Sequence, residues 1–304
     1  MVAGAGSHVL VYDVGGSHLS AALCATSDLS LGAVVKVPLP EAQTAEAFVD
    51  VLANLAVKAG AQRQAAAGAG FAMPGPFDYA EGISWMKHKM PYLYGINLRD
   101  AFAQRMHWAG GQVRFINDAA AYLLGEVGVG AARGAGRVVG FTLGTGIGSG
   151  YAVNGRLVTE GKGVPPGGEI WNVPFEGGIV EDLISTRAIK HSYLERTGRE
   201  KEVAEIAAGA EDDAIAKEVF DEFGHNLGRA LRVLLHDFAP DVVVLGGGIA
   251  QSSKLFLPTA RKELEGVKLE LRIAMLGDRA PLVGAAVAWL AHAEQTHTAV
   301  SHPQ

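Results

Sequence analysis

The chain has 304 residues, 49% of them hydrophobic and 19% charged, so it can bury a sizeable core and is not typical of a disordered protein. Its formal net charge is −6, with neither sign gathered in a long run, which argues against binding to nucleic acid. The single cysteine, Cys24, excludes an internal disulfide and a multi-cysteine zinc site. The first residues lack the basic segment of a signal peptide, so we expect none, and the single cysteine is consistent with the cytoplasmic location that we expect.

Glycine is abundant, with 40 residues, and it marks turns between apolar strands. Residues 9–12 are rich in strand-forming side chains, and the pattern resumes at 18–24 after the polar and glycine-rich segment Asp13–Ser17. We therefore expect a β-hairpin with that segment at its tip. Apolar residues at helical spacing then predict a helix over residues 41–60.

The following stretch alternates strands with helices, and one of its strands ends in two polar residues. We expect a strand at 69–72, a rigid loop at Met73–Pro76, a helix at 97–108, a strand at 112–116 and a helix at 119–127. Asn117 and Asp118 lie between that last strand and the last helix. Because ligands of α/β proteins bind at the carboxyl ends of strands, this pair is a candidate for the functional site.

The uncharged run 138–155 is long enough to suggest a membrane helix, but it is interrupted by Gly144, Gly146, Gly148 and Gly150. A second hairpin is the better interpretation, with strands at 138–143 and 151–153 around the tip Gly144–Gly150. The chain thus repeats the pattern with which it begins. Further on, we expect helices at 180–194, 211–238 and 282–292, a buried strand at 242–245 that runs into Gly246, Gly247 and Gly248, and a mobile tail from Thr296.

Three glycine-rich turns, each at the end of an apolar strand, are the main functional signal. Phosphate groups bind where backbone N–H groups converge, and glycine permits the close approach that this requires. A single turn of this kind is more often only a hairpin, whereas three of them together with Asn117 and Asp118 favour a nucleotide site. The dinucleotide motif G-x-G-x-x-G is absent, and Gly163 follows Lys162 where a Walker motif needs Ser or Thr.

Several segments together resemble the ROK family of bacterial sugar kinases and repressors, in the same order and over nearly the whole chain. These segments are Asp13–Ser17, Met73–Pro76, Ile116–Ala120, Leu143–Gly150, Gly168–Glu169 and Leu245–Ala250. The resemblance implies an α/β protein with the two-lobed, ribonuclease H-like fold of actin-like ATPases and an active site in the interdomain cleft. We accordingly expect an N-terminal lobe of residues 1–118, against which a C-terminal helix at 284–304 packs, and a C-terminal lobe of residues 119–283.

The resemblance also implies a role for each of a set of polar and glycine residues. The first phosphate hairpin is expected at Gly15, Gly16 and Ser17, the second at Gly144, Thr145 and Gly146, and the adenosine contact at Gly246, Gly247 and Gly248. Asp13 is expected to hold a magnesium ion through water. The sugar is expected to meet Gly75, Asn117, Asp118, Glu169, Asn172 and Glu181. Phosphoryl transfer to a hydroxyl needs a set of this kind, with a carboxylate beside the nucleophile and charge stabilisation for the phosphoryl group.

Simpler structural roles are open for three of these residues. Asp118 is a favoured N-cap for the helix that follows, Asp13 is a common turn residue, and Glu181 is a first-turn carboxylate that the helix dipole stabilises. In this context we interpret Asp118 as the base that prepares a sugar hydroxyl to attack the γ-phosphate of ATP. Capping and catalysis by Asp118 do not exclude each other.

The sequence departs from the family pattern at three places. Trp171 and Asn172 stand where the family has Gly-His, so a customary sugar-contacting and zinc-binding histidine is replaced. The cysteine-rich loop is missing, with Ile179 where a ligand cysteine stands in the family, so we expect no zinc. His18 stands where many members have lysine, which puts a direct cationic contact to phosphate in question.

We therefore expect an ATP-dependent hexokinase of glucokinase type, using ATP and Mg²⁺, that phosphorylates the 6-hydroxyl of glucose or a related hexose as a cytoplasmic homodimer. A kinase for N-acetylmannosamine, N-acetylglucosamine or fructose is the alternative, because Trp171 and Asn172 are expected to line the sugar pocket. A DNA-binding repressor is disfavoured, since the first strand near His8 leaves no room for a helix-turn-helix. Asp13 and Asp118 disfavour a non-catalytic sugar-binding regulator. We expect neither nucleic acid nor a membrane as a partner.

Overall fold

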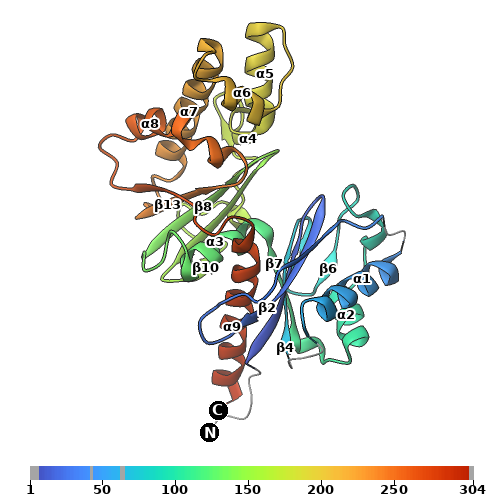
Figure 1. Cartoon of the computed structure of the whole chain (residues 1–304). Helices are drawn as coiled ribbons and strands as arrows, with labels where there is room; N and C mark the ends of the chain where they lie inside the picture. Colours follow the sequence, from blue (N-terminus) through green and yellow to red (C-terminus); the bar gives the residue numbers. More distant parts are fainter. Residues whose placement is uncertain (1–6, 42–43, 62–65, 301–304) are drawn as a thin grey trace. The chain divides into compact units, whose positions relative to one another are not determined.

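A computed structural model describes residues 7–41, 44–61 and 66–300 of the chain (Figure 1). Contacts within the chain divide it into two compact units, one formed by Met1–Val129 with Asp278–Gln304 and the other by Gly130–Gly277. The first unit thus extends beyond residue 118, where the sequence analysis placed the boundary. Within the described ranges, no helix combines the length and the apolar character that crossing a membrane requires.

The first unit is built on a five-stranded sheet in the order β3-β2-β1-β4-β7. Its strands are β1 (His8–Val14), β2 (His18–Ala25), β3 (Val35–Pro38), β4 (Ala66–Met73) and β7 (Val113–Asn117). The first three strands pair antiparallel, while β4 runs parallel to β1 and β7 runs parallel to β4. The first predicted hairpin is therefore confirmed, with the glycine-rich segment as its turn. The short strands β5 (Phe77–Asp78) and β6 (Ile83–Ser84) pair with each other after β4.

Alternate residues of β1 pack against different helices, because successive side chains of a strand point to opposite faces of the sheet. One face carries Leu10, Tyr12 and Val14 in a core with α1 (Ala45–Lys58) and α2 (Leu98–Met106). The other face carries Val9 and Val11 in a core with α9 (Ala280–Val300). Figure 1 shows α9 along one side of this sheet and α1 and α2 along the other. The start of the helix predicted over 41–60, residues 42–43, lies outside the described residues.

Helix α3 (Asp118–Val129) belongs to the first unit because it packs closely on α9. On α9, Gly284 lies so near to α3 that an added Cβ would overlap the carbonyl oxygen of Ala121. On α3, a Cβ added to Gly125 would in turn overlap the carbonyl oxygen of Ala280. Close packing of this kind leaves no room for a larger side chain at the crossing. The division between the units accordingly falls after α3 and not before it.

The C-terminal part of α9 differs from the sequence prediction. A mobile tail was expected from Thr296, but α9 continues to Val300, so the prediction is wrong for residues 296–300. The sequence offers no Gly or Pro to end this helix between Gly284 and Pro303. Residues 301–304 lie outside the described residues.

The second unit repeats the topology of the first, with a five-stranded sheet in the order β10-β9-β8-β13-β14. Its strands are β8 (Arg137–Leu143), β9 (Ile147–Val153), β10 (Arg156–Val158), β13 (Val242–Gly246) and β14 (Glu270–Ile273). Again the first three strands pair antiparallel and the last two are parallel. The uncharged run at 138–155 is thus a hairpin, as predicted. The strands β11 (Pro174–Phe175) and β12 (Gly178–Ile179) form a small separate pair.

The helices of the second unit are more numerous than the sequence pattern predicted. They are α4 (Val180–Leu183), α5 (Thr186–Thr197), α6 (Val203–Gly209), α7 (Ala214–Leu234) and α8 (Ser253–Glu263). The single helix predicted over 180–194 is wrong, because the buried Ser185 accepts a hydrogen bond from the backbone N–H of Ala188 and starts α5 there. Asp213 likewise caps α7, so the helix predicted from residue 211 begins three residues later, at Ala214.

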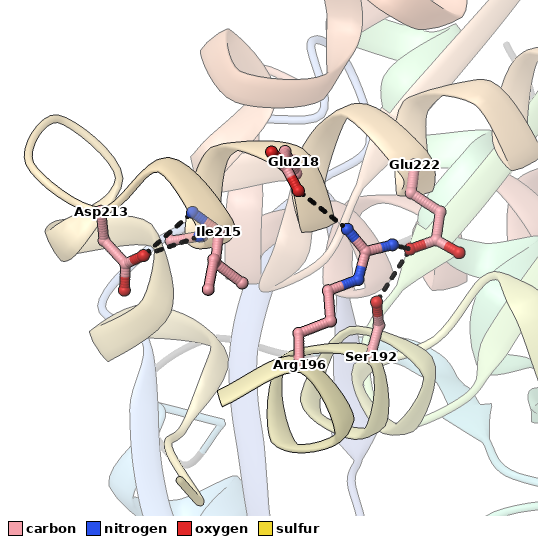
Figure 2. A network of polar contacts seen from close by, with 7 residues as sticks. Ser192, Arg196, Asp213, Ile215, Glu218 and Glu222 are labelled. Carbon is pink, nitrogen blue, oxygen red and sulfur yellow. Dashed lines mark hydrogen bonds and ion pairs between the residues drawn. The ribbon is translucent and has the colours of Figure 1, made fainter. Parts of the chain in front are cut away.

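Charged side chains fasten α5 to α7 at the surface of this unit (Figure 2). The Arg196 guanidinium lies 2.6 Å from the Glu222 carboxylate and 3.3 Å from that of Glu218. The hydroxyl of Ser192 donates a further hydrogen bond to Glu222 at 2.8 Å. Because the Arg196 side chain is 37% exposed, water screens these ion pairs. They therefore contribute little to the stability of the fold.

Candidate active site

The turn between β1 and β2 closes on itself through its backbone. The N–H of Gly15 donates to the carbonyl of His18 at 2.9 Å, and Gly16 and Ser17 are exposed at the tip. The hydroxyl of Ser17 lies 3.1 Å from Nδ1 of His18. Backbone N–H groups at such an exposed, glycine-rich tip suit an oxyanion ligand. The phosphate role predicted for Gly15, Gly16 and Ser17 stays a prediction.

Asp13, half-buried at the end of β1, carries a carboxyl group with a strongly perturbed pKa. Burial, followed by the negative charges of Asp118 and Asp278, raises its pKa to about 7, while Lys36 acts in the opposite direction. A carboxylate that burial and like charges disfavour gains from a nearby cation. The charges around Asp13 would suit a bound cation, and the Mg²⁺ role of Asp13 stays a prediction.

At the start of α3, Asn117 occupies the N-cap position. Its side-chain oxygen accepts hydrogen bonds from the backbone N–H groups of Ala119, at 3.0 Å, and Ala120, at 3.1 Å. Asp118 is the first residue of the helix, with a carboxylate oxygen 2.8 Å from the N–H of Ala119. The capping role considered for Asp118 thus falls to Asn117. Asp118 also lies close enough to Asp13 for its charge to raise the pKa of that residue.

Tyr79 connects two of the predicted sugar contacts and was not identified from the sequence. Its hydroxyl accepts a hydrogen bond from the side-chain amide of Asn117 at 3.2 Å and donates one to the carbonyl of Met73 at 3.2 Å. A Cβ added to Gly75 would lie 3.5 Å from the same hydroxyl. Gly75 and Asn117 are therefore neighbours across Tyr79. The motif Met73–Pro76 pointed to this loop, but no pattern marked the tyrosine after it.

The turn between β8 and β9 is held by α4 and α5 within the second unit. The N–H of Gly144 donates to the carbonyl of Gly146 at 3.0 Å, and the N–H of Thr186 donates to the carbonyl of Gly144 at 2.8 Å. From α4, the carboxylate of Glu181 accepts a hydrogen bond from the N–H of Ile147 at 3.2 Å. The structure therefore joins Glu181, predicted as a sugar ligand, to the turn predicted to bind phosphate.

The segment 169–172 lies against the same short helix. The indole N–H of Trp171 donates to the Glu169 carboxylate at 3.0 Å, and the Trp171 carbonyl accepts from the N–H of Glu181 at 3.1 Å. Glu169 and Asn172 are exposed, and Trp171 is 41% exposed, so the indole is not a core residue. Trp171 thus links the side chain of Glu169 to the backbone of Glu181, two of the residues predicted to contact the sugar.

The third glycine-rich turn lies beside the second one. Gly246 ends β13 opposite Thr142 of β8. Gly247 has a φ of +84°, a left-handed conformation that glycine adopts without strain, and an added Cβ there would overlap the Leu143 carbonyl. Gly247 and Gly248 are both exposed. Two of the three turns predicted to bind nucleotide therefore meet at one edge of the second sheet.

The predicted site residues fall into two sets, one on each unit. The first unit holds Asp13, Gly15, Gly16, Ser17, Gly75, Asn117 and Asp118, and the second holds Gly144, Thr145, Gly146, Glu169, Asn172, Glu181, Gly246, Gly247 and Gly248. Buried Ser149, which the sequence analysis passed over, fixes part of the second set, since its hydroxyl donates to the carbonyl of Gly168 at 2.6 Å and accepts from the N–H of Ile170 at 3.0 Å.

Comparison with known proteins identifies the family. Residues 9–294 match the model of the ROK family, and the chain therefore belongs to it. A glucokinase of Thermotoga maritima is 31% identical over 222 residues, which cover 64% of this chain and 68% of the relative.

Solved structures of the same family share the fold. The ROK hexokinase of Thermus thermophilus superposes with a TM-score of 0.81 at 27% identity, over 95% of this chain and 99% of that one. A ROK glucokinase of Streptomyces griseus, solved in complex with glucose and AMPPNP, superposes with a TM-score of 0.73 at 24% identity, over 92% of this chain and 98% of that one. The fold is that of actin-like ATPases, as the motifs implied.

Proposed function

We propose that the chain is an ATP-dependent hexokinase of glucokinase type, which transfers the γ-phosphoryl group of ATP to the 6-hydroxyl of glucose or a related hexose. The observation that carries the proposal is the place of Asp118 in the first turn of α3, where Asn117 fills the capping position and Asp13 lies close by. Membership of the ROK family and similarity to a glucokinase and a hexokinase support it.

In this proposal Asp118 is the catalytic base. The sugar hydroxyl oxygen forms a bond to the γ-phosphorus, the bond from that phosphorus to the bridging oxygen of ADP breaks, and the hydroxyl proton passes to the Asp118 carboxylate. Alcohols are weak nucleophiles at neutral pH, so a carboxylate that orients the hydroxyl and accepts its proton lowers the barrier. Gly75, Asn117, Asn172, Glu169 and Glu181 orient the remaining sugar hydroxyls.

The three glycine-rich turns receive the nucleotide. Gly15, Gly16 and Ser17 and, on the other unit, Gly144, Thr145 and Gly146 donate hydrogen bonds to phosphate oxygens, and Gly246, Gly247 and Gly248 lie against the adenosine. Asp13 would hold Mg²⁺ through water, and the ion would neutralise charge on the phosphate oxygens. The Streptomyces griseus structure with AMPPNP supports ATP as the donor.

A second candidate substrate class is an N-acetylated amino sugar or fructose. The observation that favours it is the replacement of the family's Gly-His by Trp171 and Asn172, next to the acceptor Glu169. An indole that is 41% exposed at this position offers an apolar surface that an N-acetyl group can contact.

Cytoplasmic location and a homodimeric assembly complete the proposal. The single cysteine is consistent with a reducing compartment, and the dimer rests on the family resemblance. Size-exclusion chromatography with light scattering measures the molar mass of the protein in solution. A homodimer should have the mass of two chains.

The function is tested by coupling ADP release to a spectroscopic readout across a panel of glucose, mannose, fructose, N-acetylglucosamine and N-acetylmannosamine. We expect sugar-dependent turnover that is greatest with glucose or a close relative, and that nearly disappears in Asp118→Asn. Preference for an N-acetylated sugar would select the second substrate class. If the protein binds a sugar but releases ADP with none of the sugars in the panel, the proposal is contradicted and a non-catalytic regulator is favoured.

A further inference from the structure

A row of polar side chains crosses the sheet of the first unit next to its phosphate turn. Asp13 of β1 pairs directly with Ser20 of β2, and Ser20 pairs directly with Lys36 of β3. Residues that are directly opposite on neighbouring strands point to the same face of a sheet. Asp13 and Lys36 therefore share a face, with their backbones about 10 Å apart across two strand spacings. A lysine side chain is long enough to bring its ammonium group into the space beside Asp13.

The turn itself is attached to the strand that carries this lysine. The backbone N–H of Leu39, just after β3, donates to the carbonyl of Ser17 at 2.9 Å. Strand β3 therefore ends beside the tip of the β1–β2 turn, and Lys36 reaches the same edge of the sheet as that tip.

The residue that follows the turn does not supply a cation there. Burial and the positive charge of Lys36 lower the pKa of the His18 imidazole, while the negative charge of Asp278 acts in the opposite direction. The His18 ring is therefore a weaker source of positive charge than an ordinary histidine. Lys36 acts on Asp13 as well, since its charge opposes the rise in the pKa of that carboxyl group.

Lys36 is paired with an exposed carboxylate. Its Nζ lies 2.9 Å from the carboxylate of Asp278, and the two side chains are 47% and 86% exposed. An ion pair with this exposure is screened by water and is easily exchanged for another anion. Asp278 lies two residues before the start of α9, so the pair also holds the ammonium group near the end of that helix.

We propose that Lys36 supplies the cationic contact to the phosphate chain of the nucleotide that the first turn lacks, and that it exchanges Asp278 for phosphate oxygens when the nucleotide binds. The inference rests on the proposed function, because it concerns the same nucleotide site. A polyphosphate carries more charge than one carboxylate, and it offers several oxygens to an ammonium donor. Asp278 then holds the side chain near the site before binding.

Direct binding of AMPPNP with Mg²⁺, measured by calorimetry without sugar on the full chain, tests the inference. Lys36→Met should weaken binding about 10- to 100-fold, the range expected for loss of a hydrogen bond to a charged group. Lys36→Arg should stay within a few-fold of wild type because it keeps the charge. Asp278→Asn should bind as tightly as wild type or more tightly, since a competing anion is gone. Lys58→Met, which removes an exposed lysine at the end of α1, is the matched control and should bind like wild type.

The outcomes separate this inference from the proposed function. Wild type that binds AMPPNP through Lys36 but phosphorylates no sugar refutes the hexokinase proposal and supports the role of Lys36. Unchanged binding in Lys36→Met overturns the inference, even in an enzyme that turns over. Equal weakening by Lys36→Met and Asp278→Asn also overturns it, because the pair is then a structural brace. If wild type binds no AMPPNP, the hexokinase proposal and the inference about Lys36 are both refuted. If Lys36→Met does not fold, Lys36→Gln is used in its place.

Discussion

The indole N–H of Trp171 donates a hydrogen bond to the carboxylate of Glu169 at 3.0 Å, and the ring of Trp171 remains 41% exposed. If Glu169 accepts hydrogen bonds from a sugar, then sugar binding changes both the partner of the indole and the water around it. Trp171 therefore lies where its fluorescence can report on occupation of the proposed sugar site.

Titration with the preferred sugar should change the fluorescence of wild type and leave that of Trp171→Phe nearly constant. The physical reason is the loss of an indole that contacts a proposed sugar acceptor. The measurement is an emission titration on both proteins, with dissociation constants checked by calorimetry. An equal signal in Trp171→Phe would assign the change to Trp85, Trp108 or Trp289 and remove Trp171 from the site.

The crossing of α3 and α9 should not tolerate a methyl group at Gly284. A Cβ there would overlap the carbonyl oxygen of Ala121, so Gly284→Ala should destabilise the protein by about 1–3 kcal/mol, the usual range for overpacking. Gly111→Ala is the matched control, since a Cβ at Gly111 meets nothing within 4 Å. Denaturant unfolding of both variants is the measurement. If Gly284→Ala and Gly111→Ala unfold at the same denaturant concentration, α3 and α9 are packed less closely than described.

Because the pKa of Asp13 is raised, ionisation of its carboxyl group should destabilise the folded protein as the pH rises. Its folded-state pKa of about 7 lies above its ordinary value of 3.8, so the folded protein binds this proton more tightly than the unfolded chain does. The resulting stabilisation is present below about pH 4 and is lost as the pH rises through 7. Asp13→Asn carries no charge at this position and should therefore melt at a higher temperature than wild type at pH 8. The difference between the two melting temperatures should become smaller toward pH 5.

Melting curves in a chelating buffer check this, with the exposed Asp212→Asn as control. Excess Mg²⁺ should narrow the gap at pH 8, because a cation favours the charged form of Asp13. A gap that is constant with pH would show that the Asp13 carboxyl titrates normally.

The protein should contain much less than one zinc per chain. Asn172 and Ile179 stand where the family has zinc ligands, and neither binds this metal well. Within the ranges that the structure describes, no three His, Cys, Asp or Glu side chains are grouped to hold a metal. Elemental analysis of protein purified through a chelating step is the measurement. About one zinc per chain, lost together with stability, would show that another ligand set exists.

The elements that lie around the site could be predicted because their signals are local. Short runs of strand-forming apolar residues identified β1, β2 and β8, and glycine identified the turns that follow β1 and β8, since both signals depend on a few adjacent residues. Asn117 and Asp118 could be placed at a strand end for the same reason. The resemblance to the ROK family implied the two-lobed architecture, and the repeated hairpin agreed with it.

The remaining features depend on contacts that no local pattern contains. Ser185 breaks a continuous helical pattern because its side chain competes for a backbone N–H group, a choice that apolar spacing does not show. The approach of Gly284 to Ala121 and the pairing of Lys36 with Asp278 join segments more than 150 residues apart in sequence, with a separation of 242 residues for the latter. The assignment of the capping role to Asn117 and not to Asp118 also required coordinates.

The central claim is that Asp118 accepts the proton of the attacking sugar hydroxyl, and the turnover number of Asp118→Asn tests it most directly. The amide keeps the size and one acceptor oxygen but cannot take the proton, so kcat should fall about 10²- to 10⁴-fold while the sugar dissociation constant changes little. Asn117→Ala serves as the stability comparison, with a loss of about 1 kcal/mol from the missing cap. A folded Asp118→Asn that turns over at nearly the wild-type rate would contradict the account.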